Sequence, residues 1–365
     1  MMSSPMSSHA SRRARLQSLA RDRKCSAVLV SDVVNVRYLT GFTGSNAAVL
    51  VPVDGEPVFA TDGRYTEQAR VETELEPVLV KGDLAAELLR QAGVQAGGPV
   101  AVETHVLTHD TYSRLRELDP PVELVSASRA VEELRAVKDA AEVASLRAAC
   151  EISTAALELL VSEPLVARSE RELARRLEAY LLDLGAEAVG FDTILATGPH
   201  SSVPHHSPTD REVAVGDLLK IDFGARVDGY HADCTRTFVV GREPADWQRE
   251  VHAAVESAQA RGVAHARAGA KTKDVDAAVR ASLSPTGYAD RFVHGLGHGV
   301  GLQIHEDPQL GATTTGTLAD RAVITIEPGV YLPGRGGVRI EDTLVVTDGA
   351  PEVLTTATKE LRVVG

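Results

Sequence analysis

The segment LLKIDFGARVDGYHADCTRTFVV, residues 218–240, contains two apolar, strand-like runs on either side of Asp228-Gly229. Asp-Gly is a favoured two-residue hairpin turn, because both central residues of that turn need positive φ. If these two residues form the loop, Val227 faces Tyr230 and every later pair in the two strands follows from that register. The segment therefore predicts an antiparallel hairpin.

This register places two acidic residues on one face of the hairpin. Asp222 is expected opposite Thr235, and Asp233 lies two residues along the same strand as Thr235. The two carboxylates then form a diagonal pair, with Cα atoms about 7–8 Å apart. Two acids at this spacing could reach one cation.

A second acidic hairpin is expected in VITIEPGVYLPGRGGVRIEDTLVV, residues 323–346. If its PGRG segment is the turn, Glu327 and Glu341 come out nearly opposite each other. Like charges that face each other destabilise a sheet unless something neutralises them, and buried carboxylates are paired or coordinate metal. Arg335 and Arg339 are alternative partners, so ion pairing and metal binding both remain open at this point.

Three histidines occur in FVHGLGHGVGLQIHEDP, residues 292–308, separated by several glycines. They are His294, His298 and His305. Histidine is the commonest metal ligand and the usual acid or base near neutral pH, and glycine lets a backbone bend and approach a ligand closely. A regular strand would point His298 and His305 to opposite faces, so a distortion is needed if both serve one site. The spacing matches neither GxGxxG nor HExxH.

One imidazole and four carboxylates suit two divalent cations bridged by a water or hydroxide. Such a pair of metals lowers the pKa of the bridging oxygen and polarises a carbonyl group. Four carboxylates also balance the charge of two divalent ions. Oxygen-rich donors favour manganese or cobalt, with iron and zinc as further candidates.

Composition narrows the class of protein. The chain has 365 residues, 44% of them hydrophobic and 24% charged, with a net charge of −13. This acidic balance argues against nucleic acid or an anionic membrane as partner. Three widely spaced cysteines form no disulfide framework, and the first residues lack the apolar run of a secretory signal. A cytoplasmic location is expected.

The residue composition and the hydrophobic pattern of the chain change near residue 131. Before it, short apolar runs such as SAVLVSD, AAVLVPV, PVFATD, PVLVK and PVAVE alternate with helical stretches. From Glu132 to Leu160 the chain is rich in Ala, Glu, Arg and Leu without Gly or Pro, which predicts one or two long helices. We therefore predict an α/β (α+β) protein with domains at residues 1–131 and 132–365.

Several ordered motifs resemble the pita-bread metallopeptidases, and specifically their Xaa-Pro branch of aminopeptidase P and prolidase. In the C-terminal half the resemblance rests on FDTILATGPHSSVPHH, KIDFGARVDGYHADCTRTF, HGLGHGVGLQIHEDP, ITIEPGVY and GGVRIEDT. In the N-terminal half it rests on VRYLTGFTGSNAAVLV and TDGRYTEQA. The resemblance implies a small creatinase-like N-terminal domain and a C-terminal catalytic domain with a curved, largely antiparallel sheet.

The resemblance also implies roles for individual residues. The metal ligands would be Asp222, Asp233, His298, Glu327 and Glu341. Asp233 and Glu341 would bridge both ions, and Glu327 would also act as general base.

Further residues would act around the metals. His205 would position the substrate and transfer protons, and His305 would stabilise the tetrahedral intermediate. His294 would shape the pocket for the proline side chain, and Tyr331 and Arg339 would support the metal ligands. His200, His206 and Cys234 are taken as structural neighbours.

The implied activity is hydrolysis of the Xaa-Pro bond at the N-terminus of a peptide. Relatives of this kind use the N-terminal domain to cover the site or to pair subunits. A homodimer is therefore expected, and the N-terminal domain is expected to contribute no metal ligand. Prolidases often carry an arginine after HExP that can hold the carboxylate of a dipeptide. Here Gln309 follows HEDP, which weakens a strict dipeptidase, although Arg335 could substitute.

Three alternatives differ in a checkable way. Methionine aminopeptidase shares the five ligands but usually lacks an N-terminal domain of this size. Creatinase shares the fold without using metals, and the intact ligand set argues against it. A binding module on the same fold would have lost ligands, and none is missing here.

Overall fold

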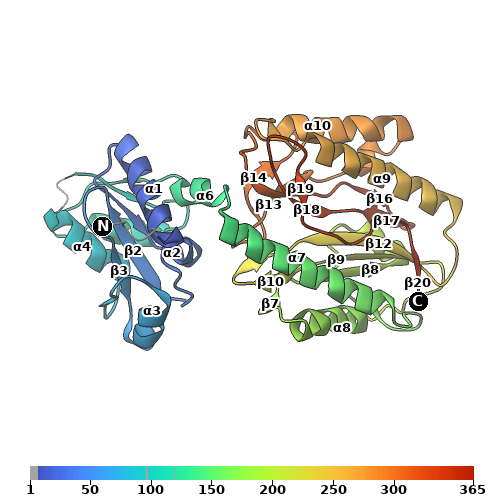
Figure 1. Cartoon of the computed structure of the whole chain (residues 1–365), viewed down its shortest axis with the longest axis horizontal. Helices are drawn as coiled ribbons and strands as arrows, with labels where there is room; N and C mark the ends of the chain where they lie inside the picture. The colour runs from blue at the N-terminus through green and yellow to red at the C-terminus, as the bar shows by residue number, and fades with distance from the viewer. Residues whose placement is uncertain (1–6, 96–97, 120) are drawn as a thin grey trace, which may run out of the picture. The chain divides into compact units, whose positions relative to one another are not determined.

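The computed structural model describes residues 7–95, 98–119 and 121–365 (Figure 1). Contacts between Cα atoms divide the chain into two compact units, Met1–Arg135 and Ala136–Gly365. The boundary expected after Val131 falls inside the short helix α6 (Ala130–Arg135), the last element of the first unit. Each unit is described by itself.

The N-terminal unit is built on a six-stranded sheet in the order β4-β3-β2-β1-β5-β6. Its strands are β1 (Ala27–Val30), β2 (Ala47–Pro52), β3 (Val58–Thr61), β4 (Val78–Leu79), β5 (Val100–Val102) and β6 (Leu124–Ser126). The central strand β1 is antiparallel to β2 and parallel to β5. The five apolar runs noted in the sequence correspond to β1–β5, which confirms the α/β character of this unit.

Helices cover both faces of this sheet. They are α1 (Ser8–Asp22), α2 (Val33–Thr40), α3 (Thr66–Glu72), α4 (Leu84–Gln95), α5 (His109–Arg116) and α6, with a 3-10 turn, η1 (Gly63–Tyr65). Every residue of β1 is buried, as expected for a strand with helices on both sides. Ala27 and Leu29 pack in one apolar cluster with Leu88 and Leu89 of α4.

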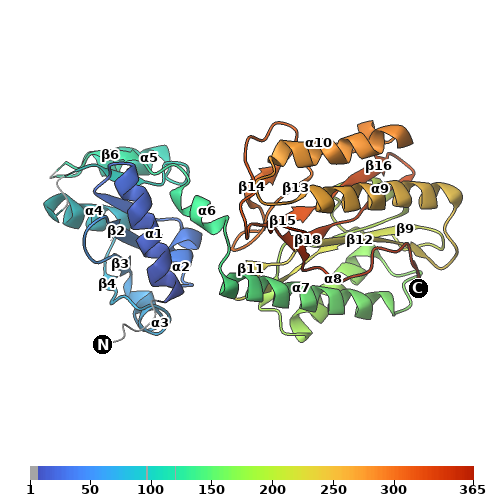
Figure 2. The same cartoon turned by 45° about the horizontal axis from the view of Figure 1, so that its top comes forward.

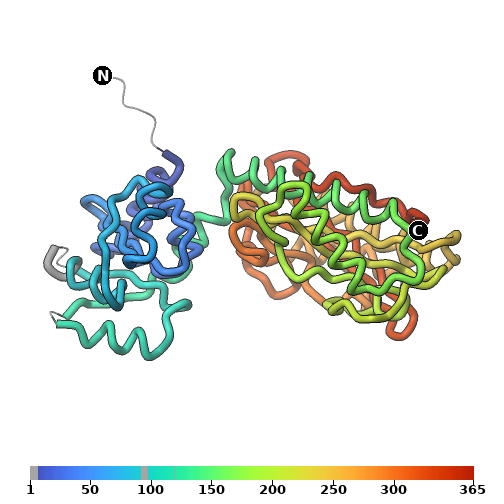
Figure 3. The backbone as a smooth tube through the Cα atoms, turned by 90° about the horizontal axis from the view of Figure 1, so that it is seen from below, coloured from blue at the N-terminus to red at the C-terminus, as the bar shows by residue number. Residues whose placement is uncertain are grey.

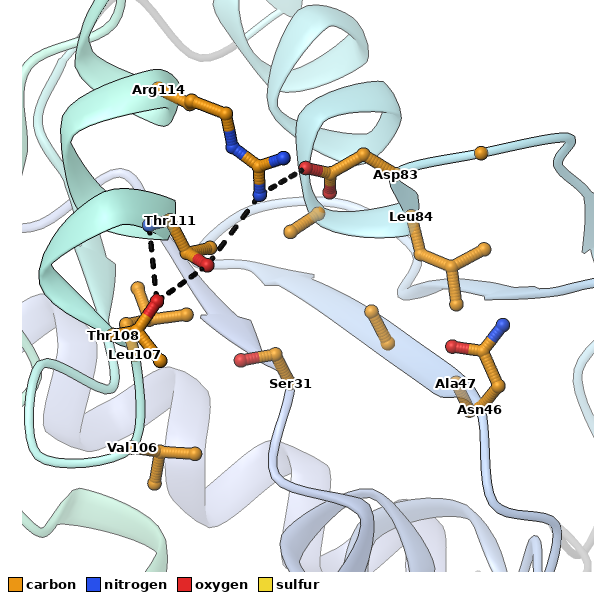
Figure 4. A pocket seen from close by; sticks show the side chains of 13 residues that line it. Ser31, Asn46, Ala47, Asp83, Leu84, Val106, Leu107, Thr108, Thr111 and Arg114 are labelled. Carbon is orange, nitrogen blue, oxygen red and sulfur yellow. Dashed lines mark hydrogen bonds and ion pairs between the residues drawn. The ribbon is translucent and has the colours of Figure 1, made fainter.

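The N-terminal unit also contains a surface pocket of about 510 Å³ (Figure 4). The first turns of α4 and α5 border it. Arg114 ion-pairs with Asp83 at 3.3 Å and donates to Thr111 Oγ1 at 3.5 Å, and the Thr111 amide donates to Thr108 Oγ1. No residue expected to bind metal or substrate lines this pocket.

The C-terminal unit holds fourteen short strands among its described residues. They are β7 (Ala188–Val189), β8 (Ile194–Thr197), β9 (Leu218–Phe223), β10 (Ala225–Val227), β11 (Tyr230–His231), β12 (Cys234–Val240), β13 (Gly297–Gly299), β14 (Glu306–Leu310), β15 (Val323–Ile326), β16 (Gly329–Leu332), β17 (Gly336–Arg339), β18 (Asp342–Val345), β19 (Glu352–Val353) and β20 (Val363–Val364). The two larger sheets have the orders β20-β12-β9-β8 and β14-β13-β15-β18-β19. All pairs in them are antiparallel except β12 with β20. The largely antiparallel sheet expected for this domain is confirmed.

Two helix pairs enclose these strands (Figures 1 and 2). They are α7 (Ala140–Val161) with α8 (Glu170–Asp183), and α9 (Asp246–His265) with α10 (Thr272–Leu283); η2 (Gly198–Ser202), η3 (Ser284–Thr286) and η4 (Ala289–Arg291) are 3-10 turns. Seen from below, α7 and α8 lie in front of the strands (Figure 3). The helix expected to begin near Glu132 is realised as α6 and α7, separated where Asp139 begins a capping box for α7.

The first acidic hairpin has the expected register. Val227 pairs with Tyr230, and Thr235 pairs with Asp222. Asp228 and Gly229 both have positive φ, 50° and 81°, as the turn requires.

The second acidic hairpin keeps one register through two consecutive strand pairs. Ile326 pairs with Asp342, and Gly329 pairs with Arg339. Continued across the gap between these pairs, the same register puts Glu327 opposite Glu341. The structure thereby confirms the nearly opposed glutamates.

Among the residues that the structure describes, no helix has the length and apolar character needed to cross a membrane.

Candidate metal centre

A cavity of about 230 Å³ in the C-terminal unit collects the acidic and histidine residues singled out above. It is lined by Phe191, Asp192, Ile194, His205, Asp222, Asp233, His298, Ile304, His305, Glu327 and Glu341. All five expected ligands therefore meet at one place, together with two of the three histidines expected to act on the substrate.

The five groups come from the two larger sheets. Asp222 lies in β9 and Asp233 directly precedes β12, in the first sheet; His298 lies in β13, in the second. Glu327 follows β15 and Glu341 precedes β18. The centre is thus assembled where the ends and breaks of strands from both sheets converge.

The interatomic distances are those of a compact site. His298 Nε2 lies 3.5 Å from Asp233 Oδ2 and 3.5 Å from Glu327 Oε1. One potential ligand atom from each of Asp233, His298 and Glu341 lies within 4.8 Å of the others. Asp222 Oδ1 is buried without a hydrogen-bond partner among the described residues. A cation among these atoms would satisfy that orphaned oxygen.

The carboxyl groups are held in an environment that disfavours their charge. Burial raises the pKa of Asp233 well above its ordinary value, and the charges of Glu341 and Asp222 raise it further. Burial and the charges of Glu327 and Asp222 likewise raise the pKa of Glu341. The pKa of Glu327 is raised to about 8, chiefly by burial. Buried acids that repel one another need a compensating positive charge, so this donor set fits divalent cations.

His298 is prepared to act as a neutral ligand. Burial lowers its pKa to about 4, so the imidazole is uncharged near neutral pH. Its Nδ1 lies 3.0 Å from the carbonyl oxygen of Gly299, and donating there leaves Nε2 unprotonated toward the acids. A hydrogen bond of this kind from the distal nitrogen orients metal-binding histidines.

The distortion needed to bring His298 and His305 together is present. The β13–β14 register shifts between Gly297 and Gly299, and the centroids of the two imidazole rings are 4.4 Å apart. A Cβ at Gly297 would lie 2.1 Å from Thr325 O. Glycine at this position thus permits the close approach of β13 and β15.

Arg339 connects the acidic centre to its surroundings. It is buried, ion-pairs with Asp222, and donates to Thr235 Oγ1 at 3.0 Å and to Tyr331 OH at 2.9 Å. Arginine pairing, left open by the sequence, is therefore realised for Asp222. Arg335 instead lies over the Trp247 ring, with its guanidinium carbon 4.3 Å from the centroid.

His294 and Tyr331 form a pair next to this network. His294 Nε2 and Tyr331 OH are 2.9 Å apart, and Phe292 packs edge-on against His294 with ring centroids 5.0 Å apart. Neither His294 nor Tyr331 lines the cavity. The role of His294 beside a proline side chain stays a prediction.

Two buried residues of the C-terminal unit were missed by sequence reasoning. Glu170 lies within hydrogen-bonding distance of His200 and His206 and forms with them a second His-carboxylate cluster. Lys220 donates to the carbonyl oxygens of Val203 and Pro204 at 2.6 and 3.1 Å. The only available signal was the capping box formed by Ser169 and Glu172, which starts a helix at Glu170.

Comparison with known proteins agrees with this site. The model of metallopeptidase family M24 matches residues 144–348, and that of the creatinase/prolidase N-terminal domain matches residues 12–137. The chain belongs to metallopeptidase family M24 and is a metallopeptidase of the pita-bread fold. Its creatinase-like N-terminal domain places it in the branch that contains the Xaa-Pro peptidases.

Individual relatives are similar over nearly their whole length. The Xaa-Pro dipeptidase of Pyrococcus furiosus is 35% identical over 353 residues, covering 95% of this chain and 99% of the relative. The structure of an Xaa-Pro dipeptidase from Bacillus anthracis has a TM-score of 0.92 at 36% identity, covering 98% and 100% of the two chains. An X-Pro aminopeptidase from Thermotoga maritima has a TM-score of 0.88 at 34% identity, covering 96% and 99%.

Proposed function

We propose that this protein is a dinuclear-metal exopeptidase that hydrolyses the Xaa-Pro bond at the N-terminus of peptides. The observation that carries the proposal is the convergence of four carboxylates and one neutral imidazole in a single cavity. Similarity to Xaa-Pro dipeptidases and to an X-Pro aminopeptidase supports proline as the second residue of the substrate.

Two divalent ions, manganese or cobalt, would be held by the five residues of the cavity. These residues are Asp222, Asp233, His298, Glu327 and Glu341. Asp233 and Glu341 would be the shared ligands, as the resemblance to the pita-bread metallopeptidases implies. When bound, the ions would supply a Lewis acid and an activated water.

The chain's own residues then bind the peptide and move protons. Glu327 lines the cavity beside His298 and is the proposed general base. His205 and His305 line the same cavity. We propose that His305 donates an N–H to the oxyanion of the tetrahedral intermediate, a kind of contact that strengthens as charge develops.

The residue after HEDP bears on substrate length. The side-chain amide of Gln309 is uncharged, and it donates a hydrogen bond to the carbonyl oxygen of Glu306 in the same strand at 2.9 Å. Arg335 is stacked on Trp247. With neither residue aimed at a free carboxylate, we propose that peptides longer than dipeptides are accepted.

The decisive experiment compares release of alanine from Ala-Pro and Ala-Pro-Ala. The chelated protein should be inactive, and manganese or cobalt should restore turnover of both peptides. Full activity after verified metal removal would overturn the metal-dependent mechanism. Turnover of Ala-Pro alone would limit the enzyme to dipeptides.

Two other candidate functions are separated by the same assay. Preferential release of methionine from Met-Ala-Ser would indicate methionine aminopeptidase specificity. Tight peptide binding without hydrolysis by the manganese-loaded protein would indicate a binding module. The homodimer and the cytoplasmic location stay predictions, and sedimentation of the purified chain tests the first.

A further inference from the structure

Glu170, the first residue of α8, is fully buried and accepts hydrogen bonds at both carboxylate oxygens. Oε1 accepts from the amide and hydroxyl of Thr197 at 2.8 and 3.0 Å and from His200 Nδ1 at 3.0 Å. Oε2 accepts from the amide and hydroxyl of Thr209 at 3.0 and 2.7 Å and from His206 Nε2 at 2.8 Å. One carboxylate thus joins the two ends of segment 197–209.

These contacts indicate that the Glu170 carboxylate anchors the segment as an anion and does not bind a metal. Burial alone would raise the pKa of Glu170, but hydrogen bonds from Thr209, His206 and Thr197 lower it to about 2. The carboxylate is therefore charged throughout the neutral range. Because a carboxylate only accepts, the nitrogens of His200 and His206 that face it carry protons. A cation would have to displace both of these donors.

The segment held by Glu170 contains His205, which lines the metal cavity. The residue before it is fixed from the other side, because Pro204 O accepts from Lys220 Nζ at 3.1 Å and from Arg339 Nη1 at 3.2 Å. The residue after it, His206, is fixed by Glu170. His205 thus lies between Pro204, which is held by Arg339, and His206, which is held by Glu170.

We propose that Glu170, acting through His206, is a positioning residue that sets the place of His205 over the cavity. Glu170 itself does not line the cavity, so it acts on the reaction through the residues that it holds, and His205 is the residue of segment 197–209 that lines the cavity. The inference rests on the proposed function, in which His205 contacts the substrate. Misplacement of a reacting group by 1 Å can lower the rate about 100-fold.

The test uses the isosteric variant Glu170→Gln in the full-length, metal-loaded protein. The amide keeps the volume but replaces one acceptor oxygen with an NH2 group. The backbone N–H of Thr197 or Thr209 that faced this oxygen then has no acceptor, which weakens the hold on that end of the segment. With Ala-Pro-Ala as substrate, we expect kcat to fall roughly 10- to 100-fold with a smaller change in KM and an unchanged metal content.

The matched control is Glu163→Gln. Glu163 is also a carboxylate with several partners, Arg168 at 2.8 Å and Arg176 at 3.0 Å among them, but it does not contact segment 197–209. We expect kcat of this variant to stay within about two-fold of wild type, as is usual for surface changes away from a site.

A second pair of variants covers the case in which Glu170→Gln does not fold. His206→Gln retains a side-chain N–H that can reach Glu170, whereas His206→Ala removes it. Turnover should be largely retained in His206→Gln and lost in His206→Ala. Equal activity of these two variants would overturn the proposal, as would a third bound ion that disappears in His206→Ala.

A double-mutant cycle separates this inference from the proposed function. In a His205→Ala background, Glu170→Gln should have no further effect on kcat, because non-additivity reports coupling of the two residues. Additive effects would overturn the positioning role while leaving the peptidase assignment intact. If wild type releases no alanine from Ala-Pro-Ala while folded and metal-loaded, the proposed function fails first.

Discussion

His298 Nε2, in β13, lies 3.5 Å from Oδ2 of Asp233, which precedes β12 in a different sheet. The imidazole is neutral, with a pKa lowered to about 4 by burial, and burial raises the pKa of the aspartate. The contact is therefore not a strong ion pair in the metal-free protein. Its value lies in presenting two donor atoms to a cation.

Asp233→Asn should separate stability from activity. Removing one of several mutually repelling buried acids should raise the melting temperature of the chelated protein. Activity with manganese should fall more than about 100-fold, because the loss of a metal ligand should lower activity more than the loss of a residue that only orients a ligand. Calorimetry and a peptidase assay on the same preparation measure both. Wild-type turnover by the variant would contradict the assigned role of Asp233.

The stability of the chelated protein should fall as pH rises through the neutral range. Glu327 has a pKa raised from 4.5 to about 8 in the folded state, so between these values the folded chain holds a proton that the unfolded chain has lost. The free energy of unfolding then decreases as pH rises between these two values. Glu327 has no effect on it below pH 4.5, and its destabilising effect is complete above about pH 8.

Denaturant titrations at pH 7 and pH 8, with and without manganese, measure this effect. Buried histidines such as His298 and His294, whose pKa is lowered to about 4, are largely neutral in both the folded and the unfolded chain at these pH values and do not oppose it. Manganese should stabilise the protein more at pH 8, since deprotonated carboxylates are the ligands. A chelated protein that is more stable at pH 8 than at pH 7 would contradict the prediction.

Arg339→Lys should lower kcat/KM about 10- to 100-fold, the usual range for a residue that orients metal ligands. Arg339 serves Asp222, Thr235 and Tyr331 at once, and a lysine ammonium cannot reproduce the planar fork of donors. Steady-state kinetics check the prediction. Arg335→Lys is the control, because Arg335 stacks on Trp247 outside the cavity, and a loss of equal size there would argue against it.

Gly297→Ala should destabilise the protein by about 1–3 kcal/mol, as overpacking does, and weaken metal binding. The added Cβ would lie 2.1 Å from Thr325 O, so β13 must move, and His298 with it. Gly316→Ala is the control, since its Cβ would meet nothing nearer than 3.6 Å. Thermal unfolding and manganese titration of both variants test this; equal stability of the two would refute the steric argument.

The sequence by itself determined both acidic hairpins. Asp228-Gly229 requires a tight turn, and the alternation around Ile326 and Val338 aligns Glu327 with Glu341. These features are local, because turn chemistry and a two-residue period set register between adjacent strands. The ligand set followed from the motifs that resemble the pita-bread metallopeptidases, and the structure places all five of those residues in one cavity.

Only the tertiary structure decided how the two sheets meet. The shift between Gly297 and Gly299, which brings His298 against His305, depends on the approach of β15 and β14. The gathering of segment 197–209 around Glu170 depends on packing of α8. No local period or turn rule records such contacts, because they are set by how distant elements pack, and a buried carboxylate shows its importance only when its donors are seen around it.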